Sequence, residues 1–469
     1  MREISLPDTW IITQFMNLIE LQNGFAYKSS SYVEAGAFVI RIGNVQDGYV
    51  SLHNPAYIKP SEMEGSPFEL FSEDILISLT GNIGRVAIIK EDQLPAVLNQ
   101  RVARVVLGKN IDRYFVFHSL QSRSTLEAII NKAKGAAQLN VSTKDILNIH
   151  TPIPPLAEQK EIAFRLDTLL AQVEATQARL ARIPDIIKRF RQSVLAAAVS
   201  GKLTEEWRKN NDSQFPYSVC RLSDVIHEMR NGLSLKPNEN GEGHPILRIS
   251  SVRSFSLDQV DVRYLDISKK DQERYGLKQN DLLFTRYNGS VDFVGVCARI
   301  KSIEHDVLLY PDKLIRVRVD NEKIMPEYLE IFAASQGARD YIFSLVKSTS
   351  GQKGISGTDL KQLQVKLPSV SEQAEIVRRV EQLFAYADTL EQQAKAAKEL
   401  IDNLTQAILA KAFRGELTAD WRAANPDLIS GDNSAAALLA RIQAERANAK
   451  PRKRASKPAI SPTSSGVTQ

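Results

Sequence analysis

Arginine, lysine, asparagine, glutamine, serine and threonine side chains gather in the Gly- and Asn-containing segments between the short apolar runs of this chain. Their donors and acceptors match the edges of base pairs in the major groove of DNA. Residues 284–290 combine Arg, Tyr, Asn and Gly in one predicted turn, where glycine permits close approach to a phosphate. Taken singly, each such residue is more often a solvated surface group or a turn cap. The prediction therefore concerns the loops as sets.

Two sets of candidate DNA-binding residues follow, one in each half of the chain. The first set is Lys28, Arg41, Asn44, Thr80, Asn82, Arg85, Asn99, Gln100 and Arg101, with Gln138 and Asn140 in the loop before a long predicted helix. The second set is Arg230, Asn231, Lys236, Arg248, Ser251, Arg253, Arg286, Tyr287, Asn288, Lys313, Gln352 and Lys353.

Arg41 and Arg248 form a special case, because each is predicted to lie inside an apolar strand. An arginine that faces inward needs a partner for its charge. The repetition is consistent with a shared structural ion pair and equally with a shared phosphate contact. The residues alone leave both interpretations open.

No catalytic constellation accompanies these residues. Asn425-Pro426-Asp427 is the nearest approach to the Asn/Asp-Pro-Pro-aromatic motif of adenine methyltransferases, and it lies in a polar tail. No GxxxxGK[ST] phosphate loop exists, and the Gly pairs that begin at Gly81 and Gly351 are predicted turns. Pro311-Asp312-Lys313 lacks the second acidic residue and lysine of a nuclease site, and the six histidines are scattered. We expect neither catalysis nor a metal or cofactor site in this chain.

Composition narrows the class of protein further. A length of 469 residues exceeds what one core usually serves, so we expect at least two domains. No apolar run is long enough to span a membrane, and the N-terminus lacks a secretory signal, which predicts a cytoplasmic protein. Cys220 and Cys297 have no partner at metal-ligand spacing. The net charge of +5 permits a polyanionic partner without requiring one.

The elements that position the candidate residues occur twice. EQKEIAFRLDTLLA from Glu158 matches EQAEIVRRVEQLFA from Glu372, 214 residues later, and the same register pairs GKLTEEWR from Gly201 with GELTADWR from Gly415. Upstream the likeness fades into short Val-, Ile- and Leu-rich strands and two helical segments per copy. Each copy is therefore predicted to be a mixed α/β domain followed by a long helix, with similar helices and divergent loops.

The two long helices carry apolar residues in alternating steps of three and four, the pattern of a coiled-coil seam. Pro184 interrupts the first helix, where we expect a bend rather than an end. Two seams of equal length in one chain can satisfy each other, and antiparallel pairing relates the two globular domains by a pseudo-twofold axis. The predicted seam residues are Ile162, Leu166, Leu169, Val173, Leu180, Ile187, Ile376, Val380, Leu383, Leu390, Ile401 and Leu404.

These repeated motifs resemble the specificity subunit of bacterial type I restriction–modification enzymes, almost from LPDTW near the start to beyond the second WR motif. The resemblance implies two target-recognition domains that each read one half of an asymmetric, bipartite DNA site, with antiparallel helices that set the unread spacer. It also implies a subunit without chemistry of its own, docked to two modification (methyltransferase) subunits and to helicase-nuclease restriction subunits. S-adenosylmethionine, ATP and Mg would then belong to those partners, and no homo-oligomer is expected.

The domain boundaries follow from the repeat and the resemblance. We expect recognition domains at residues 1–155 and 209–369, helical spacer regions at 156–208 and 370–424, and a C-terminal helix with a basic, disordered tail at 425–469. The tail carries Lys450, Arg452, Lys453, Arg454 and Lys457, which add nonspecific phosphate attraction or form a solvated tail.

Two alternatives remain: a stand-alone bivalent DNA-binding regulator and a scaffold for two protein partners. A regulator usually reaches two half-sites by homodimerising a short chain, and a scaffold has no need of divergent Arg- and Asn-rich loops. Neighbouring genes for a methyltransferase and a helicase-nuclease would decide for the restriction–modification subunit. The target bases and the spacer length do not follow from the sequence.

Overall fold

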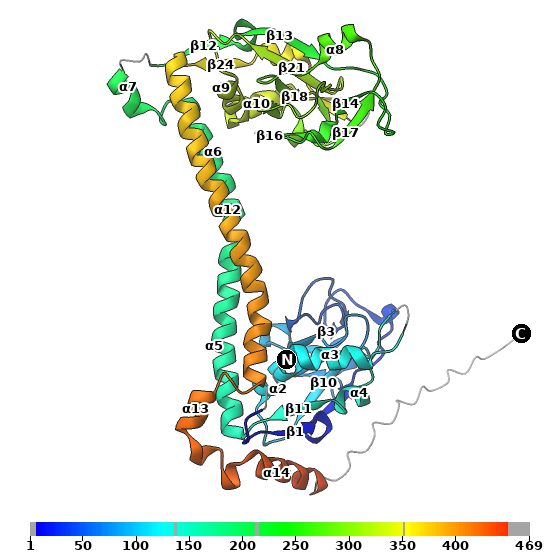
Figure 1. Ribbon diagram of the computed structural model, residues 1–469. Coiled ribbons are helices and arrows are strands. Elements are labelled where there is room, and N and C mark those ends of the chain that lie inside the picture. Colours follow the sequence, from blue (N-terminus) through cyan, green and yellow to red (C-terminus); the bar gives the residue numbers. More distant parts are fainter. Residues whose placement is uncertain (1–5, 136–137, 212–214, 350–351, 449–469) are drawn as a thin grey trace, which may run out of the picture. The chain divides into compact units, whose positions relative to one another are not determined.

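The computed structural model describes residues 6–135, 138–211, 215–349 and 352–448 (Figure 1). It divides into two compact units, residues 1–179 with 398–469, and residues 180–397. Each unit holds one globular domain together with a segment of both long helical regions. Within the described residues, no helix is long and apolar enough to cross a membrane.

The first domain is built on a five-stranded sheet in the order β2-β10-β7-β8-β4 and a four-stranded sheet in the order β5-β3-β9-β6, with β1 and β11 paired separately. Its strands are β1 (Ile11–Gln14), β2 (Ile19–Asn23), β3 (Ala37–Ile40), β4 (Gly48–Tyr49), β5 (Tyr57–Ile58), β6 (Glu69–Leu70), β7 (Ile75–Ser78), β8 (Val86–Ile88), β9 (Ala96–Leu98), β10 (Val102–Leu107) and β11 (His150–Ile153). Its helices are α1 (Pro60–Met63), α2 (Arg113–Gln121), α3 (Arg123–Lys132) and α4 (Thr143–Leu147).

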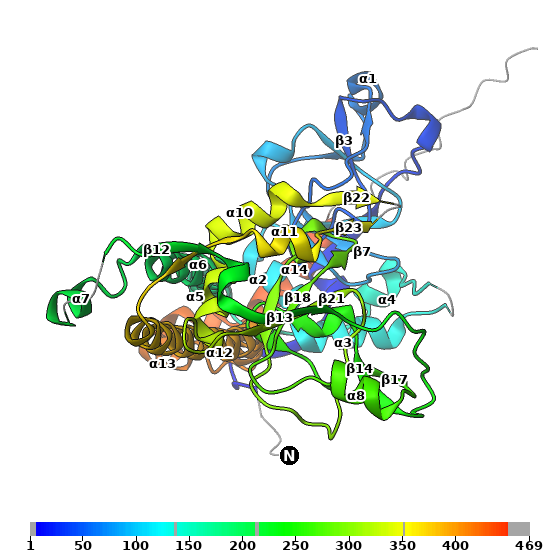
Figure 2. The same cartoon turned by 90° about the horizontal axis from the view of Figure 1, so that it is seen from above.

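The second domain repeats this plan with a four-stranded sheet, β13-β21-β18-β20, and with β12 and β24 paired separately. Its β14-β17 pair has a parallel bridge from Ile246 to Leu309, as β3 has to β9 in the first domain. A three-stranded sheet, β19-β23-β22, and a β15-β16 hairpin complete it. Figure 2 shows β22, β23 and α11 of this domain from above. The strands are β12 (Ser218–Arg221), β13 (Ile226–Asn231), β14 (His244–Leu247), β15 (Val252–Arg253), β16 (Ser256–Leu257), β17 (Val262–Leu265), β18 (Leu282–Thr285), β19 (Tyr287–Asn288), β20 (Cys297–Arg299), β21 (Leu314–Val319), β22 (Lys347–Thr349), β23 (Gln352–Gly354) and β24 (Gln364–Leu367). The helices are α7 (Glu205–Asn211), α8 (Lys269–Tyr275), α9 (Pro326–Ala334), α10 (Gln336–Leu345) and α11 (Gly357–Lys361).

One central strand per domain is buried on both faces, which explains its continuous apolar sequence. In β7, Ile75 and Ile77 join the core beneath the helices, whereas Leu76 joins a second core on the other face of the sheet. In β18, Leu282 and Phe284 face the helices and Leu283 faces the second core. In each domain, the two cores on either face of this sheet therefore share one strand.

The first long helical region breaks at Pro184. The segment α5 (Leu156–Ala181) ends one residue before α6 (Ile183–Ser200) begins, and Arg182 between them keeps right-handed helical dihedral angles. Pro184 lies in the first turn of α6, where its missing N–H is not needed. The proline therefore interrupts the helix for one residue, and the chain keeps its helical course as α6. The second copy is a single helix, α12 (Val370–Phe413).

The long helices pair antiparallel inside each unit. In the first unit, Arg165 bonds the Leu417 carbonyl (2.8 Å), while Gln177, further along α5, bonds Asp402 (3.1 Å). In the second unit, Arg379 bonds the Leu203 carbonyl (2.7 Å) and Arg191 pairs with Asp388 (2.6 Å). As the number on one helix rises, the number on its partner falls, which defines antiparallel pairing.

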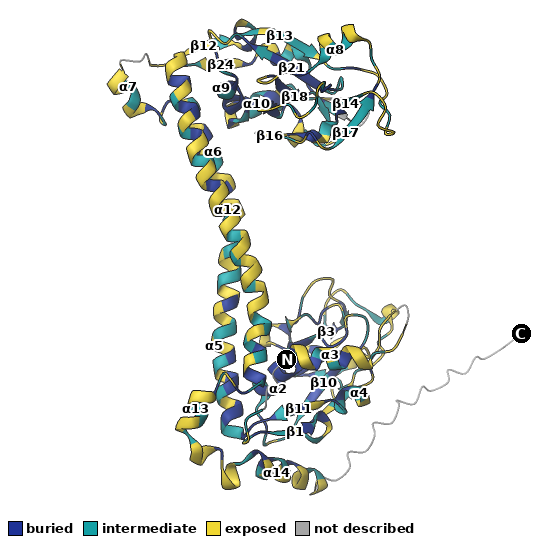
Figure 3. Ribbon diagram, in the orientation of Figure 1, coloured by how far each residue is buried: buried dark blue, intermediate teal, exposed yellow. Residues whose placement is uncertain are grey.

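The predicted seam is buried most where a domain also covers it (Figure 3). Leu390 and Leu404 are 38% and 39% exposed, because a helix pair without a third element shields only one side of a leucine. Ile162, Leu166, Val173, Ile187, Ile376 and Val380 are buried, and Leu169, Leu180, Leu383 and Ile401 are half-buried.

The predicted C-terminal helix is present as α14 (Ala435–Asn448), which follows the short helix α13 (Ala419–Ala424). Leu438 and Ile442 of α14 are buried in the main core of the first domain. The end of the described chain therefore packs on its beginning. The basic cluster from Lys450 to Lys457 lies outside the described residues.

Candidate nucleic-acid interface

A glycine in each domain lets two candidate loops meet. In the first domain the N–H of Gly24 donates to Val102 (3.3 Å), and that of Gln100 donates to Phe25 (3.0 Å). A Cβ on Gly24 would lie 2.3 Å from the Leu98 carbonyl oxygen, so only glycine fits. The contact holds residues 99–101 against the chain that follows β2.

The second domain has the same junction. The N–H of Gly232 donates to Leu314 (3.2 Å), and that of Asp312 donates to Leu233 (2.8 Å). A Cβ on Gly232 would lie 2.2 Å from the Tyr310 carbonyl oxygen. Residues 311–313 therefore occupy the place that residues 99–101 occupy in the first domain.

A second contact joins two more candidate loops in each domain. Thr80 pairs with Asn140 in an isolated antiparallel bridge, and Tyr287 pairs with Gly354 between β19 and β23. These loops also meet the glycine-supported ones, because the N–H of Leu79 donates to Arg101 (3.0 Å) and that of Arg286 donates to Lys313 (2.8 Å). The predicted turn at residues 284–290 is thus partly strand, and the candidate loops of each domain gather on one side.

A hollow of about 530 Å³ lies among the gathered loops of the first domain. The polar residues that line this hollow include Tyr27, Tyr32, Arg41, His53, Asn54, Asn99, Gln100 and Arg101. The Arg41 guanidinium carbon lies 5.9 Å from the centroid of the Tyr32 ring, and the guanidinium donates to the Asn54 carbonyl oxygen. Such a lining of cations, amides and aromatic rings suits nucleic acid.

Asn44 and Ser251, both predicted to contact DNA, are buried turn residues in the structure. Each is 2% exposed and accepts a hydrogen bond from the backbone N–H of Arg41 or Arg248 (3.1 Å in both). Asn44 also donates to Ser51 and His53 (3.0 and 3.1 Å). Both side chains close a turn, so they have no group left for a base edge.

Arg41 and Arg248 follow strands β3 and β14 instead of lying inside them. Arg248 pairs with Asp261 (2.8 Å), whereas Arg41 bonds a carbonyl oxygen, so the two share no ion pair. A repeated pair exists elsewhere, between Arg104 and Asp74 (3.2 Å) and between Arg316 and Asp281 (4.0 Å). Its sequence signal is an arginine inside each of the apolar strands β10 and β21.

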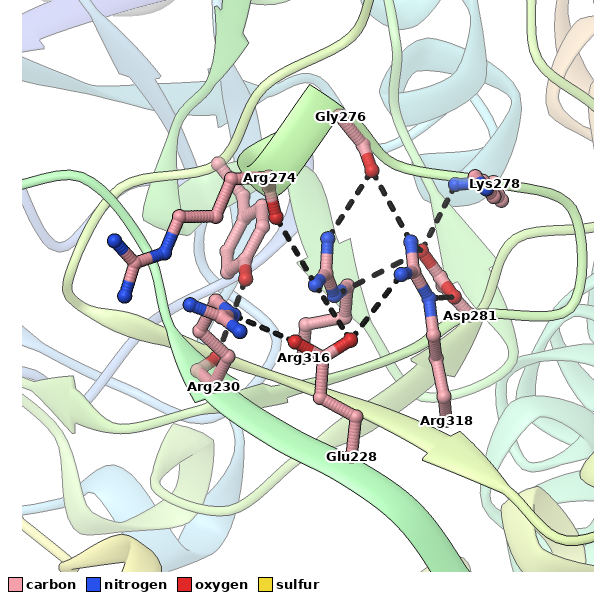
Figure 4. Close-up of polar contacts among 9 residues, drawn as sticks. Glu228, Arg230, Arg274, Gly276, Lys278, Asp281, Arg316 and Arg318 are labelled. Atoms are coloured by element: carbon pink, nitrogen blue, oxygen red, sulfur yellow. Dashed lines mark hydrogen bonds and ion pairs between the residues drawn. The ribbon is translucent and has the colours of Figure 1, made fainter. Parts of the chain in front are cut away.

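Arg316 belongs to a partly buried network of ion pairs that includes Arg230 of the second candidate set (Figure 4). Its side chain is 1% exposed and bonds Glu228 (2.9 Å), which also bonds Arg318 (3.2 Å) and the candidate Arg230 (2.6 Å). Burial acts to raise the pKa of Glu228, but the Arg230 hydrogen bond and the guanidinium charges hold it below its usual value. The carboxylate therefore stays charged, and Arg230 is held by it.

The other candidates differ in their solvent exposure and in the contacts that their side chains make within the protein. Arg85 donates a hydrogen bond to the side chain of Gln46 (2.8 Å). The guanidinium groups of Arg253 and Arg286 stack on the rings of Phe293 and Tyr287, each 4.7 Å from the ring centroid. Arg253 ends β15, and Phe255 of the same hairpin packs on Phe384 of α12 with 5.2 Å between ring centroids. The exposed candidates are Lys28, Asn82, Gln100, Arg101, Gln138, Asn140, Asn231, Lys236 and Arg253. Thr80, Asn288, Lys313 and Lys353 are half-buried, Asn99 is buried, and Gln352 lies in β23.

A buried junction in the first unit was not predicted. Glu158, at the start of α5, is 0% exposed and accepts bonds from Trp10 Nε1 (2.9 Å), Thr418 Oγ1 (2.7 Å) and Arg422 Nε (2.9 Å). Thr418 and Arg422 belong to the GELTADWR motif of the other repeat. The start of one helical region is thus bonded to the end of the other.

The second unit contains the reciprocal junction. Glu372, at the start of α12, is 0% exposed and accepts bonds from Thr204 (2.6 Å), Arg208 (2.6 Å) and Tyr217 (2.7 Å). Thr204 and Arg208 belong to the GKLTEEWR motif of the first repeat. The same Glu, Thr and Arg occur in both copies of the repeat. Their identity indicates the duplication, but their sequence positions alone do not reveal that they bond to one another.

No group of three or more His, Cys, Asp or Glu residues in the described ranges is placed to hold a metal ion. The gathered loops consist of donors, acceptors and aromatic rings.

Comparison with known proteins agrees with this geometry. The family model of the type I restriction modification DNA specificity domain matches residues 7–185 and 216–399. The type I restriction enzyme EcoKI specificity subunit of Escherichia coli (strain K12) is 49% identical over 449 residues, 94% of this chain and 96% of that protein. The StySPI specificity subunit of Salmonella potsdam is 40% identical, with the same shares covered.

Solved structures show the same fold. The HsdS subunit from Thermoanaerobacter tengcongensis aligns with a TM-score of 0.57 at 17% identity, over 88% of this chain and 98% of that one. A chain solved for the complex assembly and conformational transition of the type I R-M system aligns with a TM-score of 0.61 at 16% identity, over 88% and 99%. The predicted fold class of two tandem α/β domains with long antiparallel helices is confirmed. The chain belongs to the family of type I restriction–modification specificity subunits.

Proposed function

We propose that this chain gives a type I restriction–modification complex its DNA sequence specificity, and that each domain reads one half of an asymmetric, bipartite target. The observation that carries the proposal is one scaffold with two sets of side chains. The junctions at Gly24 and Gly232 hold Asn-Gln-Arg at residues 99–101 and Pro-Asp-Lys at residues 311–313. The two domains thus share a loop backbone but carry different side chains on it, as two different half-sites require.

The chain acts in this proposal as a subunit without catalysis. Two methyltransferase subunits supply S-adenosylmethionine chemistry on adenine, and restriction subunits supply ATP- and Mg-dependent cleavage. The long helices dock the methyltransferase subunits and set the spacer, and the chain itself stays monomeric in the DNA-associated, cytoplasmic complex. The antiparallel contact in each unit supports this role for the helices.

The exposed candidates and half-buried Lys313, Lys353, Arg286, Tyr287 and Thr80 are proposed to face DNA. A stand-alone bivalent regulator would use the same surface. The two functions differ in their need for partners, because a regulator binds its target alone and leaves no methylated adenine.

Domain exchange tests the proposal. Residues 1–155 are replaced by those of a relative with another target, and methylated adenines are mapped in cells that carry the complete system. We expect one half-site to change and the other to stay, while the matched exchange of residues 209–369 changes only the opposite half. Because α14 packs on the first domain, the first exchange is also made with α14 of the same relative. A change in both half-sites would contradict modular reading.

Helix length provides an independent test of the spacer. Removal of one heptad from each long helical region should alter the spacer and leave both half-sites unchanged. A variant with altered half-sites and an unaltered spacer would contradict the proposed role of the helices.

A further inference from the structure

The tips of the two glycine-supported loops carry different hydrogen-bonding groups at one structural position. Gln100 and Asp312 each donate a backbone N–H to the carbonyl oxygen of the residue after the junction glycine, Phe25 or Leu233. The amide of Gln100 both donates and accepts, whereas the Asp312 carboxylate only accepts. The two domains therefore present opposite chemistry at their tips.

Asp312 has two basic neighbours, Lys313 and Arg286, but no ion pair within the described residues. Lys313 follows it directly, and the N–H of Arg286 bonds the Lys313 carbonyl oxygen (2.8 Å). Arg286 reaches only the backbone carbonyl oxygen of Asp312, at 3.5 Å. Among the described residues, no basic side chain lies within ion-pair distance of the Asp312 carboxylate. The carboxylate is thus not accounted for by charge neutralisation inside the domain.

Ser234 orients this carboxylate. Its hydroxyl donates to Asp312 Oδ2 (3.2 Å), and no described residue donates to Oδ1. Ser234 lies just beyond Leu233, so the same glycine-supported junction that holds the loop also holds the side chain. One oxygen is fixed and the other remains an acceptor.

A free carboxylate on a surface that meets DNA is repelled by phosphates. The part of the duplex that attracts it is an exocyclic amino group in the major groove, N4 of cytosine or N6 of adenine. We infer that Asp312 is a specificity-determining residue of the second domain and that its carboxylate accepts a hydrogen bond from such an amino group. Gln100 occupies the same position in the first domain, where its amide suits an adenine edge. The inference rests on the proposed function.

The first experiment maps methylated adenines in cells that carry the complete system with Asp312→Ala or Asp312→Asn. We expect one base position of the second half-site to become degenerate, while the first half-site stays unchanged. Glu322→Gln is the control, because Glu322 is exposed and lies beyond the opposite end of β21. If the variants retain both half-sites, or methylate all sites uniformly less, the inference fails. If the wild-type system yields no bipartite methylated motif, the proposed function fails first.

The second experiment removes the amino group from the DNA. The assembled methyltransferase complex binds a target duplex in which the affected base carries hydrogen in place of its exocyclic amino group. The wild type should lose about tenfold in affinity, and Asp312→Ala should lose nothing further. Equal losses in both proteins would overturn the inference. Analogues of cytosine and of adenine at that base pair distinguish N4 from N6, and Ser234→Ala should weaken the same discrimination without removal of the carboxylate.

Discussion

Replacement of Glu158 by glutamine removes one charge from the junction that joins the two repeats in the first unit. The carboxylate is 0% exposed and its Oε1 atom accepts from both Thr418 and Arg422. Glutamine keeps the shape and one oxygen acceptor, so the Trp10 and Thr418 bonds have a partial substitute. Arg422, 15% exposed, loses its counter-charge.

The magnitude follows from that loss. Removal of one partner of a buried ion pair costs about 3 to 5 kcal/mol, because the other charge stays buried and uncompensated. The partial exposure of Arg422 places the expected loss near the lower end, about 3 kcal/mol. For a unit of this size, about 2 to 4 °C per kcal/mol converts it to a fall of about 6 to 12 °C in the melting temperature.

Hydrogen exchange locates the effect and calorimetry measures it. We expect faster exchange at α13 and at the start of α5, with the second unit unchanged. Glu127→Gln is the control, because Glu127 and Arg123 form an exposed pair four residues apart that contributes less than about 0.5 kcal/mol. A loss below about 1 kcal/mol for Glu158→Gln, or equal loosening of the second unit, would refute this reasoning.

Two further substitutions test α14 and the second junction. Leu438→Ala should destabilise the first domain by about 2 to 5 kcal/mol, because Leu438 is fully buried in its core; the same change at exposed Leu428 should cost little, and equal melting temperatures for the two variants would contradict the packing. Tyr217→Phe tests alkaline stability. Burial, together with the hydrogen bond to Glu372, raises the pKa of Tyr217 to about 12. The folded protein favours the neutral phenol. The contribution of this preference to the free energy of unfolding is therefore present below about pH 10 and is lost between about pH 10 and 12. Urea unfolding over that range should show a steeper decline for the wild type than for Tyr217→Phe, and parallel curves would contradict it.

The order of domains and long helices was predictable from the sequence, because heptad spacing and the 214-residue repeat can be recognised without the fold. Pro184 was located correctly as a disturbance, but whether a proline bends a helix or divides it depends on packing. The partners of arginines were not predictable. Arg316 meets Asp281 through strand pairing, and Glu158 meets Thr418 across 260 residues of sequence.

The candidate loops were identified as sets, and their members could not be separated by residue type. Asn44 and Gln100 have similar amide side chains, yet one closes a buried turn and the other is exposed at a loop tip. Asp312 was considered only as part of a nuclease triplet and discounted there. Its place opposite Gln100 depends on the backbone contacts of Gly232, which only the fold reveals.

We propose above all that one chain carries two domains that recognise different DNA half-sites. Mapping of methylated adenines in a genome that carries the complete wild-type system tests it most directly. We expect one asymmetric motif with two unlike half-sites and an unread spacer of fixed length. A single contiguous motif, or two identical half-sites in a palindrome, would contradict it.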